Sequence, residues 1–239
     1  MRTLTPAMED YLKVIYKLQQ KDAKVTTQAI AKAMRVKPAS VTNMLKKLAR
    51  LRLVQYSAYK GVRLTPTGER MALEIIRHHR LLELYLRQAL NMPLHKVHEE
   101  AERLEHALSE ELEDLIAAAL GNPTHDPHGH PIPTKEGHFD EPPHQSLSEA
   151  PHGQKFLIVR VSDSDTEMLR YLEELGLVPH AIVTVLRREP FGGPIWVQVD
   201  DRTHALGQEV AHHVFVRPLA EVKANVKAAS PRRSKRRPA

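Results

Sequence analysis

The chain has no cysteine and no long apolar run, and each absence excludes a class of protein. Without cysteine there can be no disulfide bond, no thiolate zinc site and no catalytic cysteine. No apolar stretch approaches the ~20 residues of a membrane-spanning helix, and the N-terminus lacks a signal peptide's apolar segment. We therefore expect a soluble cytoplasmic protein that does not bind membranes. Its 239 residues, 41% of them hydrophobic, suffice for one to three compact domains.

Charge is distributed unevenly along the chain. Residues 1–70 hold 15 Lys/Arg against 4 Asp/Glu, or +11, and residues 71–220 hold 13 against 24, or −11. Residues 221–239 hold 7 against 1, which adds +6 and gives the total of +6. A basic N-terminal part predicts a polyanionic partner, and an acidic middle part predicts bound cations.

The first seventy residues predict three helices followed by a β-hairpin. Thr5-Pro6 and Thr26 are typical helix starts, because threonine caps helix N-termini and proline suits the first helical position. Pro38 begins a third helix, whose apolar residues fall on one side at about 100° per residue. The segment VQYSAYKGVRLT then predicts a hairpin turning near residues 59–61. This order is typical of a winged helix-turn-helix domain.

The outer side of the third helix is suited to DNA. A helix fits the major groove and reads bases with short polar side chains, while lysine and arginine contact phosphates. A winged helix used only for protein contacts is the alternative, but the positive charge favours DNA. The expected DNA contacts are Lys37, Ala39, Ser40, Thr42, Asn43, Lys46, Lys47 and Arg50, with Lys60 and Arg63 on the wing.

Two longer helices are predicted next, over residues 69–91 and 94–120. The first is apolar around much of its circumference, so it needs partners on more than one side. The second helix is one partner. A second copy of the chain is the expected other, and coverage by the C-terminal domain is the alternative. A homodimer would also let a small reading domain address two half-sites of palindromic DNA.

The C-terminal half differs in composition. Residues 121–153 hold seven prolines and six histidines, which predicts a linker rather than a rigid metal site. The segments FLIVRV, IVTVLRR, PIWVQVD and HVFVRPL predict the strands of a small β-barrel with one short helix. We thus expect domains over residues 1–70, 71–120 and 154–220, a linker over 121–153, and a basic disordered tail over 221–239 that attracts DNA.

The stretch HEEAERLEHALS, residues 98–109, predicts part of one continuous helix with a band of histidine and glutamate. A step of about 100° per residue from Val97 defines an apolar stripe. That stripe holds Val97, Ala101, Leu104, Leu108, Leu112 and Leu115. Charged groups beside a core are costly unless paired, and one divalent cation could pair several. The candidates are His98, Glu102, Glu105 and His106, with His79 and Glu83 on one face of the preceding helix.

These residues also allow other interpretations. For any single residue, a surface ion pair with a neighbouring arginine is the simpler explanation, but the set on two helices favours a metal site. A di-metal helical-bundle enzyme needs two Glu-x-x-His motifs, but the residue three before His106 is Arg103. A zinc protease needs histidine four residues after His98, where this chain has Glu102. We therefore expect a regulator and not an enzyme, with a winged-helix regulator that responds to an organic ligand as the alternative.

The order of winged helix, HHRLLE, VHEEAERLEH, DPHGHPIP and C-terminal barrel resembles the diphtheria-toxin-repressor family of metal-dependent transcriptional regulators. The manganese-transport regulators belong to the same group, and the likeness spans about residues 4–219. The resemblance implies a mainly α protein with an N-terminal winged helix-turn-helix, a helical dimerisation domain and a C-terminal SH3-like or FeoA-like small β-barrel. It also implies repression of metal-uptake genes.

The resemblance further implies two metal sites. One matches Asp10, Glu102, Glu105 and His106; the other matches His79, Glu83 and His98, with Asp165 and Glu167 as further ligands from the barrel domain. The manganese branch carries Glu where this chain has Lys13, so its paired manganese centre is not expected here. Oxygen and nitrogen ligands suit Mn²⁺, which we prefer, or Fe²⁺, and Zn²⁺, Co²⁺ or Ni²⁺ would also bind in vitro. Metal would join Asp10 on the reading head to the dimerisation helices.

Overall fold

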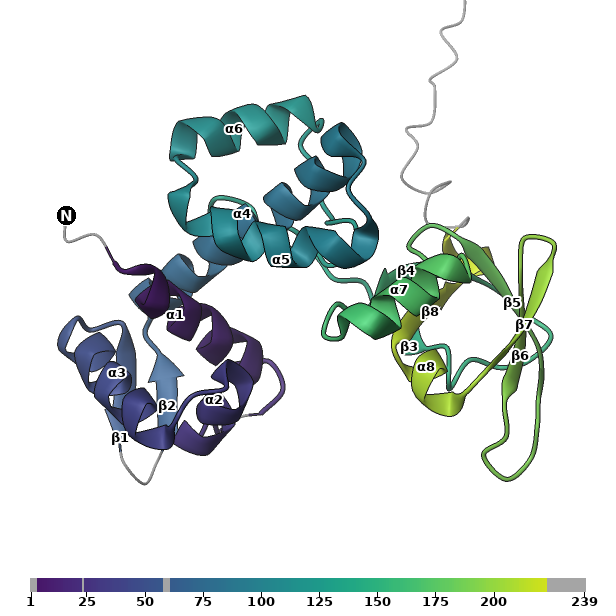
Figure 1. Ribbon diagram of the computed structural model, residues 1–239, viewed down its shortest axis with the longest axis horizontal. Coiled ribbons are helices and arrows are strands. Elements are labelled where there is room, and N and C mark those ends of the chain that lie inside the picture. Colours follow the sequence, from purple (N-terminus) through teal and green to yellow (C-terminus); the bar gives the residue numbers. More distant parts are fainter. Residues whose placement is uncertain (1–3, 23, 58–60, 223–239) are drawn as a thin grey trace, which may run out of the picture. The chain divides into compact units, whose positions relative to one another are not determined.

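The computed structural model describes residues 4–22, 24–57 and 61–222. These residues form two compact units (Figure 1). The first unit contains the described parts of Met1–Met92, Val97–Asp126 and Pro131–Asp140. The second contains Pro93–Lys96, Pro127–His130 and the described part of Glu141–Ala239. No helix among the described residues is long and apolar enough to cross a membrane.

The first unit begins with the predicted helix order and hairpin. Helices α1 (Pro6–Gln19), α2 (Thr27–Met34) and α3 (Pro38–Arg50) precede the antiparallel strands β1 (Val54–Ser57) and β2 (Gly61–Leu64). The Thr26 side chain accepts a hydrogen bond from the Ala29 amide at 3.1 Å, so it caps α2 as expected. Apolar faces of all three helices and both strands share one core. The expected hairpin turn and Lys60 lie outside the described residues.

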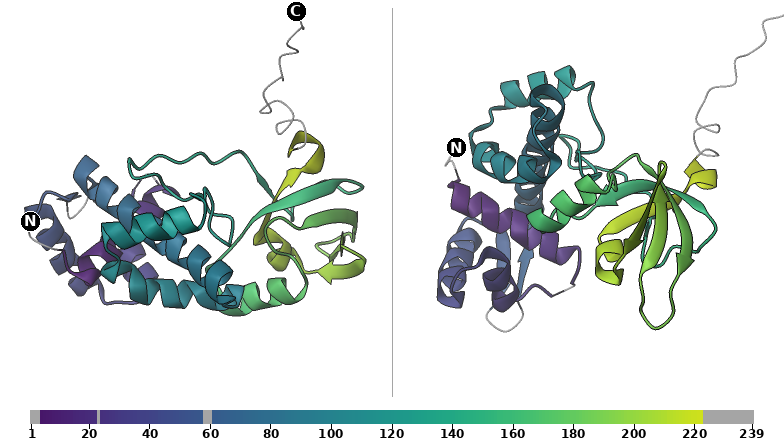
Figure 2. Two further views of the ribbon diagram at one scale, coloured as in Figure 1. Left: turned by 90° about the horizontal axis from the view of Figure 1, so that it is seen from above. Right: turned by 45° about the vertical axis from the view of Figure 1, so that its right-hand side comes forward.

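Helix α4 (Pro66–Leu90) starts three residues earlier than the expected residue 69. The Thr65 side chain accepts from the Gly68 amide at 3.1 Å, and Pro66 occupies the first helical position. The Leu53 carbonyl accepts a hydrogen bond from the Thr65 amide at 3.0 Å. Gly68 packs so closely on the same carbonyl that an added β-carbon would lie 2.0 Å from its oxygen. The end of the hairpin is therefore tied to the start of α4. Helix α1 packs on the first half of α4 (Figure 2).

The expected continuous helix over residues 94–120 is wrong. The chain forms α5 (Leu94–Leu104), the 3₁₀ turn η1 (Glu105–Ala107) and α6 (Glu110–Ala119). Leu108 is extended, and the Ser109 side chain accepts from the Leu112 amide at 3.3 Å, which starts a new helix. The expected apolar stripe therefore ends at the break, and three of its members are exposed: Leu104 (39%), Leu112 (48%) and Leu115 (61%).

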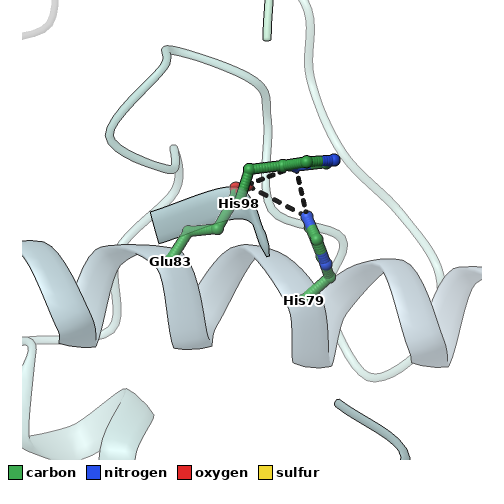
Figure 3. A group of neighbouring side chains, drawn as sticks. All are labelled: His79, Glu83 and His98. Carbon is green, nitrogen blue, oxygen red and sulfur yellow. Dashed lines mark hydrogen bonds and ion pairs between the residues drawn. The ribbon is translucent and has the colours of Figure 1, made fainter. Parts of the chain in front are cut away.

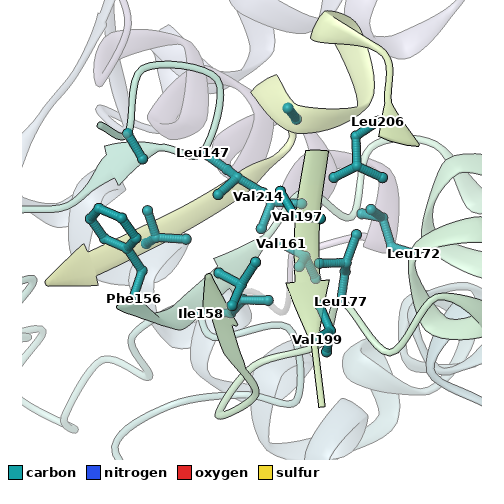
Figure 4. Packing of buried hydrophobic residues seen from close by; sticks show 14 of the residues in the cluster. Leu147, Phe156, Ile158, Val161, Leu172, Leu177, Val197, Val199, Leu206 and Val214 are labelled. Carbon is teal, nitrogen blue, oxygen red and sulfur yellow. The ribbon is translucent and has the colours of Figure 1, made fainter. Parts of the chain in front are cut away.

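The second unit is a small sheet domain. Its six antiparallel strands are ordered β3-β8-β4-β5-β6-β7. They are β3 (Gln145–Ser146), β4 (Lys155–Val161), β5 (Ile182–Arg188), β6 (Ile195–Val199), β7 (Arg202–Leu206) and β8 (Val214–Pro218). Helices α7 (Thr166–Glu174) and α8 (Gln208–His212) accompany the sheet. Register shifts in β4 and β5 increase its curvature, and the strands enclose one apolar core (Figure 4).

Parts of the proline- and histidine-rich segment are packed. Ile132 joins the helical core of the first unit, and Leu147 and Ala150 are fully buried in the core of the second. The Arg188 guanidinium donates to the carbonyls of Leu147 (3.0 Å), Ser148 and Ala150 (both 2.5 Å). This side chain therefore ties the segment to β5.

Candidate metal centre and DNA-reading face

Three potential ligands from α4 and α5 converge in the first unit (Figure 3). His79 Nε2, His98 Nδ1 and Glu83 Oε1 lie 3.0 Å from one another in all three pairs. His79 and Glu83 are one helical turn apart on α4, which places them on one face. We call these three residues the α4–α5 triad. Glu83 is fully buried and His79 nearly so, whereas His98 is partly exposed.

The second ring nitrogen of His79 has a partner of its own. His79 Nδ1 lies 2.5 Å from Glu105 Oε2, and Glu105 is fully buried. Burial alone would lower the pKa of His79, but the Glu83 carboxylate and hydrogen bonds to Glu105 and Glu83 raise it to about 9. The Glu105 carboxylate can accept a hydrogen bond from Nδ1–H while Nε2 faces the triad, and a carboxylate on the second ring nitrogen is the usual support of a metal-binding histidine.

A second group of ligands lies where α1 meets η1, and we call Asp10, Glu102, Glu105 and His106 the α1 cluster. His106 Nε2 lies 3.0 Å from Asp10 Oδ1 and 3.6 Å from Glu105 Oε1. His106 Nδ1 lies 2.6 Å from Glu9 Oε2. Burial raises the pKa of Asp10 despite the opposing effects of His106 and Lys13. Asp10, Glu105 and His106 therefore offer three atoms close enough to share an ion.

Lys13 is the buried cation of this region. Its side chain is 4% exposed, and its Nζ donates to Glu105 Oε1 at 2.5 Å and to Glu102 Oε2 at 2.9 Å. Burial would raise the pKa of Glu102, but the Lys13 ammonium holds that pKa below its usual value. Glu102 lies with His79 and Glu105 and not in the group formed by Asp10 and His106. Of the four α1-cluster residues expected to form one site, three are thus brought together directly.

The donor set of the α4–α5 triad fits a divalent cation. Two ring nitrogens and a carboxylate oxygen meet at 3.0 Å, and without metal the proton of His79 Nε2 lies among them. If both rings pointed N–H groups at Glu83, the two hydrogens would face each other. A cation accepts a lone pair from all three atoms at once, and nitrogen with carboxylate oxygen suits Mn²⁺, Fe²⁺ and Zn²⁺.

The two expected barrel-domain ligands have other partners. The Asp165 carboxylate accepts from the amides of Glu167 (2.9 Å) and Met168 (3.0 Å) and so caps α7. Glu167 is exposed and pairs with Arg170. Within the described part of the second unit, neither belongs to a group of three convergent ligand atoms. Their role as metal ligands stays a prediction.

Three residues near the site were not among the expected ligands. Glu9 contacts His106 Nδ1, and the Lys13 ammonium forms hydrogen bonds to two carboxylates of the α1 cluster, those of Glu102 and Glu105. His78, the neighbour of His79 on α4, contacts Glu113 Oε2 at 3.1 Å and the Glu105 carbonyl at 3.3 Å. The only sequence signal for these contacts was charge on apolar helices, because α1, η1 and α6 meet through tertiary packing.

The third helix presents the expected DNA-contact residues. Val41, Leu45 and Leu48 are fully buried on its inner side. Thr42 is half-buried, and its hydroxyl donates to the Pro38 carbonyl at 3.1 Å, so it reaches a partner only as an acceptor. The remaining expected contacts in the described residues are exposed, namely Lys37, Ala39, Ser40, Asn43, Lys46, Lys47 and Arg50, with Arg63 on β2.

Comparison with known families covers most of the chain. Residues 3–62 match the family described as iron dependent repressor, N-terminal DNA binding domain. Residues 65–134 match the iron dependent repressor, metal binding and dimerisation domain, and residues 145–218 match the FeoA domain. These three matches follow the order of the winged helix, the helices that carry the ligands and the small sheet domain.

Individual relatives agree with these matches. The iron-dependent repressor IdeR of Mycobacterium leprae is 31% identical over 229 residues, covering 90% of this chain and 99% of that protein. The diphtheria toxin repressor of Corynebacterium efficiens is 28% identical, covering 87% and 97%. A manganese-dependent transcriptional repressor in complex with manganese has a TM-score of 0.80 and 38% identity, covering 89% and 100%. The structure of ScaR with bound Cd²⁺ has a TM-score of 0.74 and 33% identity, covering 89% and 99%.

Proposed function

Because the chain belongs to the diphtheria-toxin-repressor family of iron- and manganese-dependent repressors, we propose that a divalent metal ion controls its binding to DNA. The observation that carries this proposal is the α4–α5 triad, whose three ligand atoms meet at 3.0 Å. It lies in the same compact unit as the exposed, basic face of α3. The chain is thus a regulator whose ligand groups and DNA-reading groups share one folded unit.

The geometry supports a specific division of work. His79, Glu83 and His98 would hold the ion, and Glu105 orients His79 through Nδ1. Asp10 and His106 join α1 of the reading head to η1. A bound ion would supply the positive charge that lets the Asp10, Glu83 and Glu105 carboxylates stay close together. The residues of α1 are then held against η1, which fixes the reading head relative to the α4–α6 helices.

The donor chemistry selects the class of metal. Every ligand offered is oxygen or nitrogen, and the chain has no cysteine. This set suits Mn²⁺ or Fe²⁺, and we favour Mn²⁺; Zn²⁺, Co²⁺ and Ni²⁺ bind such sites in vitro. Similar structures include a manganese-dependent repressor with manganese and ScaR with bound Cd²⁺ or Zn²⁺, and the similar IdeR proteins are named iron-dependent.

The DNA partner follows from the same family. We infer a homodimer that binds a palindromic operator, with one α3 in each half-site. Exposed Leu112 and Leu115 on α6 and the match to a dimerisation domain support self-association. We assign DNA contact to residues 1–70 and metal binding and dimerisation to residues 71–120. The genes controlled are those of metal uptake, which metal-bound protein represses.

The test is a DNA-binding titration of the full chain with Mn²⁺, Fe²⁺, Zn²⁺ or chelator. Metal is expected to tighten operator binding ~5–150-fold, the usual range of allosteric coupling. His98→Ala removes one triad ligand and should weaken the metal effect. His152→Ala removes an exposed histidine of the second unit and should retain it. Operator binding that chelator leaves unchanged would contradict the proposal and favour a regulator of the organic-ligand type.

A further inference from the structure

Lys13 places a positive charge inside the proposed metal-binding region. Its ammonium is almost fully buried on α1 and is bonded to Glu105 Oε1 and Glu102 Oε2. A buried ammonium is costly unless it is paired, and these two carboxylates provide the pairing. Both carboxylates also belong to the α1 cluster. The lysine and a divalent ion would therefore use the same oxygens.

The competition centres on one atom. Glu105 Oε1 is 2.5 Å from Lys13 Nζ and 3.6 Å from His106 Nε2, and Glu105 also belongs to the group of ligands formed with Asp10 and His106. A divalent ion bound to this oxygen and the Lys13 ammonium would repel each other strongly in a buried setting. An ion that bound Asp10, Glu105 and His106 would need the lysine to withdraw from Glu105.

The α4–α5 triad is placed differently with respect to Lys13. The hydrogen bonds of Nζ go to Glu102 and Glu105, and neither residue is one of the triad's three ligands. Glu105 contacts His79 through its other oxygen, Oε2. An ion at the triad therefore meets no direct competition from the ammonium for its ligand atoms.

We propose that the Lys13 ammonium is the resident cation of the α1 cluster, and that a divalent ion enters this cluster only by displacing it. The inference rests on the proposed function and makes the two centres unequal. The triad binds metal first, and the α1 cluster binds it at a higher concentration. Lys13 thus sets the metal concentration at which the reading head becomes fixed to η1.

The experiment is equilibrium dialysis with Mn²⁺ alone, followed by measurement of bound metal per chain. Wild type should bind one ion tightly and a second ion more weakly. Lys13→Gln should tighten the second ion by at least about tenfold, equivalent to about 1.4 kcal/mol. Lys17→Gln, which removes an exposed positive charge from the same helix, and Lys13→Arg, which keeps the charge, should behave as wild type.

Equal binding curves for wild type and Lys13→Gln would overturn the inference. If Lys13→Gln does not fold, His98→Ala tests the same point with Lys13 in place. This variant should lose the tight ion, and retention of a tight ion would show that the α1 cluster binds well beside the ammonium. Two tight ions in wild type with metal-dependent DNA binding would overturn the role of Lys13 alone. No tight ion in any variant would overturn the proposed function as well.

Discussion

At the scale of single residues, His79 links metal binding to pH. Its folded pKa of about 9 exceeds the ordinary value of 6.5, so the folded, metal-free chain holds its proton more strongly than the unfolded chain. The resulting stability is complete below pH 6.5 and is lost as pH rises through about 9. A metal ion on Nε2 replaces that proton, so its affinity should increase over the same interval.

We therefore expect the melting temperature of metal-free protein to fall between pH 6.5 and 9, and expect Mn²⁺ binding to release protons there. Thermal unfolding at several pH values, with calorimetry in buffers of different ionisation enthalpy, measures both effects. His152→Ala should follow wild type. A His79→Gln variant with an equally steep loss of stability would show that other groups cause it.

Also at this scale, pairwise spacing predicted part of the site. His79 and Glu83 were expected on one face of a helix and lie there, and His98 completes the triad from α5. Spacing within a helix could not show that Glu9 contacts His106 or that Lys13 contacts Glu105, because these pairs are 97 and 92 residues apart. Such contacts depend on how α1 packs against the later helices.

At the scale of elements, the break between α5 and α6 decides where the ligands lie. Glu105 and His106 are in η1, so the angular positions of their side chains cannot be calculated by continuing α5 or α6. Glutamate recurs on both sides of the break. A constant rotation of about 100° per residue therefore predicted one helix where the chain forms two. The usable signal was Ser109 followed by three acidic residues in the first turn of α6, which is typical of a helix start.

We expect Ser109→Ala to destabilise the protein by about 0.5–2 kcal/mol, because the first turn of α6 loses its cap. It should also weaken Mn²⁺ binding, since η1 immediately precedes this cap. Chemical denaturation and metal titration measure the two effects. Ser109→Asn can still cap the helix and should stay close to wild type. Equal losses for both variants would point to a packing role for Ser109.

At the scale of the whole molecule, the positive charge of residues 1–70 should appear as salt dependence of DNA binding. Lys46 and Lys47 are exposed on α3. Replacing either by alanine should weaken binding to all DNA sequences and reduce the slope of log affinity against log salt by about 1. Filter binding at several salt concentrations measures this slope. Lys155→Ala, an exposed lysine of the second unit, should not change it, and an unchanged slope in the α3 variants would remove them from the interface.

The broad architecture was predictable because each part has a local signal. Helix caps and apolar periodicity identified the winged helix, and short segments rich in β-branched residues identified the strands of the sheet domain. The packing of Ile132, Leu147 and Ala150 was not predicted, since a few apolar residues among many prolines and histidines carry no periodicity. Their burial depends on surfaces that other elements provide.

The two carboxylate oxygens of Glu105 contact different centres, and this arrangement affects how metal binding at one centre depends on the other. Its Oε2 supports His79 of the triad, and its Oε1 faces Lys13 and His106 of the α1 cluster. A change in charge at either centre therefore alters the other through one side chain, and this influence must be equal in both directions. If the first ion favours the second, the α1 cluster fills at a lower metal concentration than it would with the triad empty. That coupling would then be a property of a single glutamate.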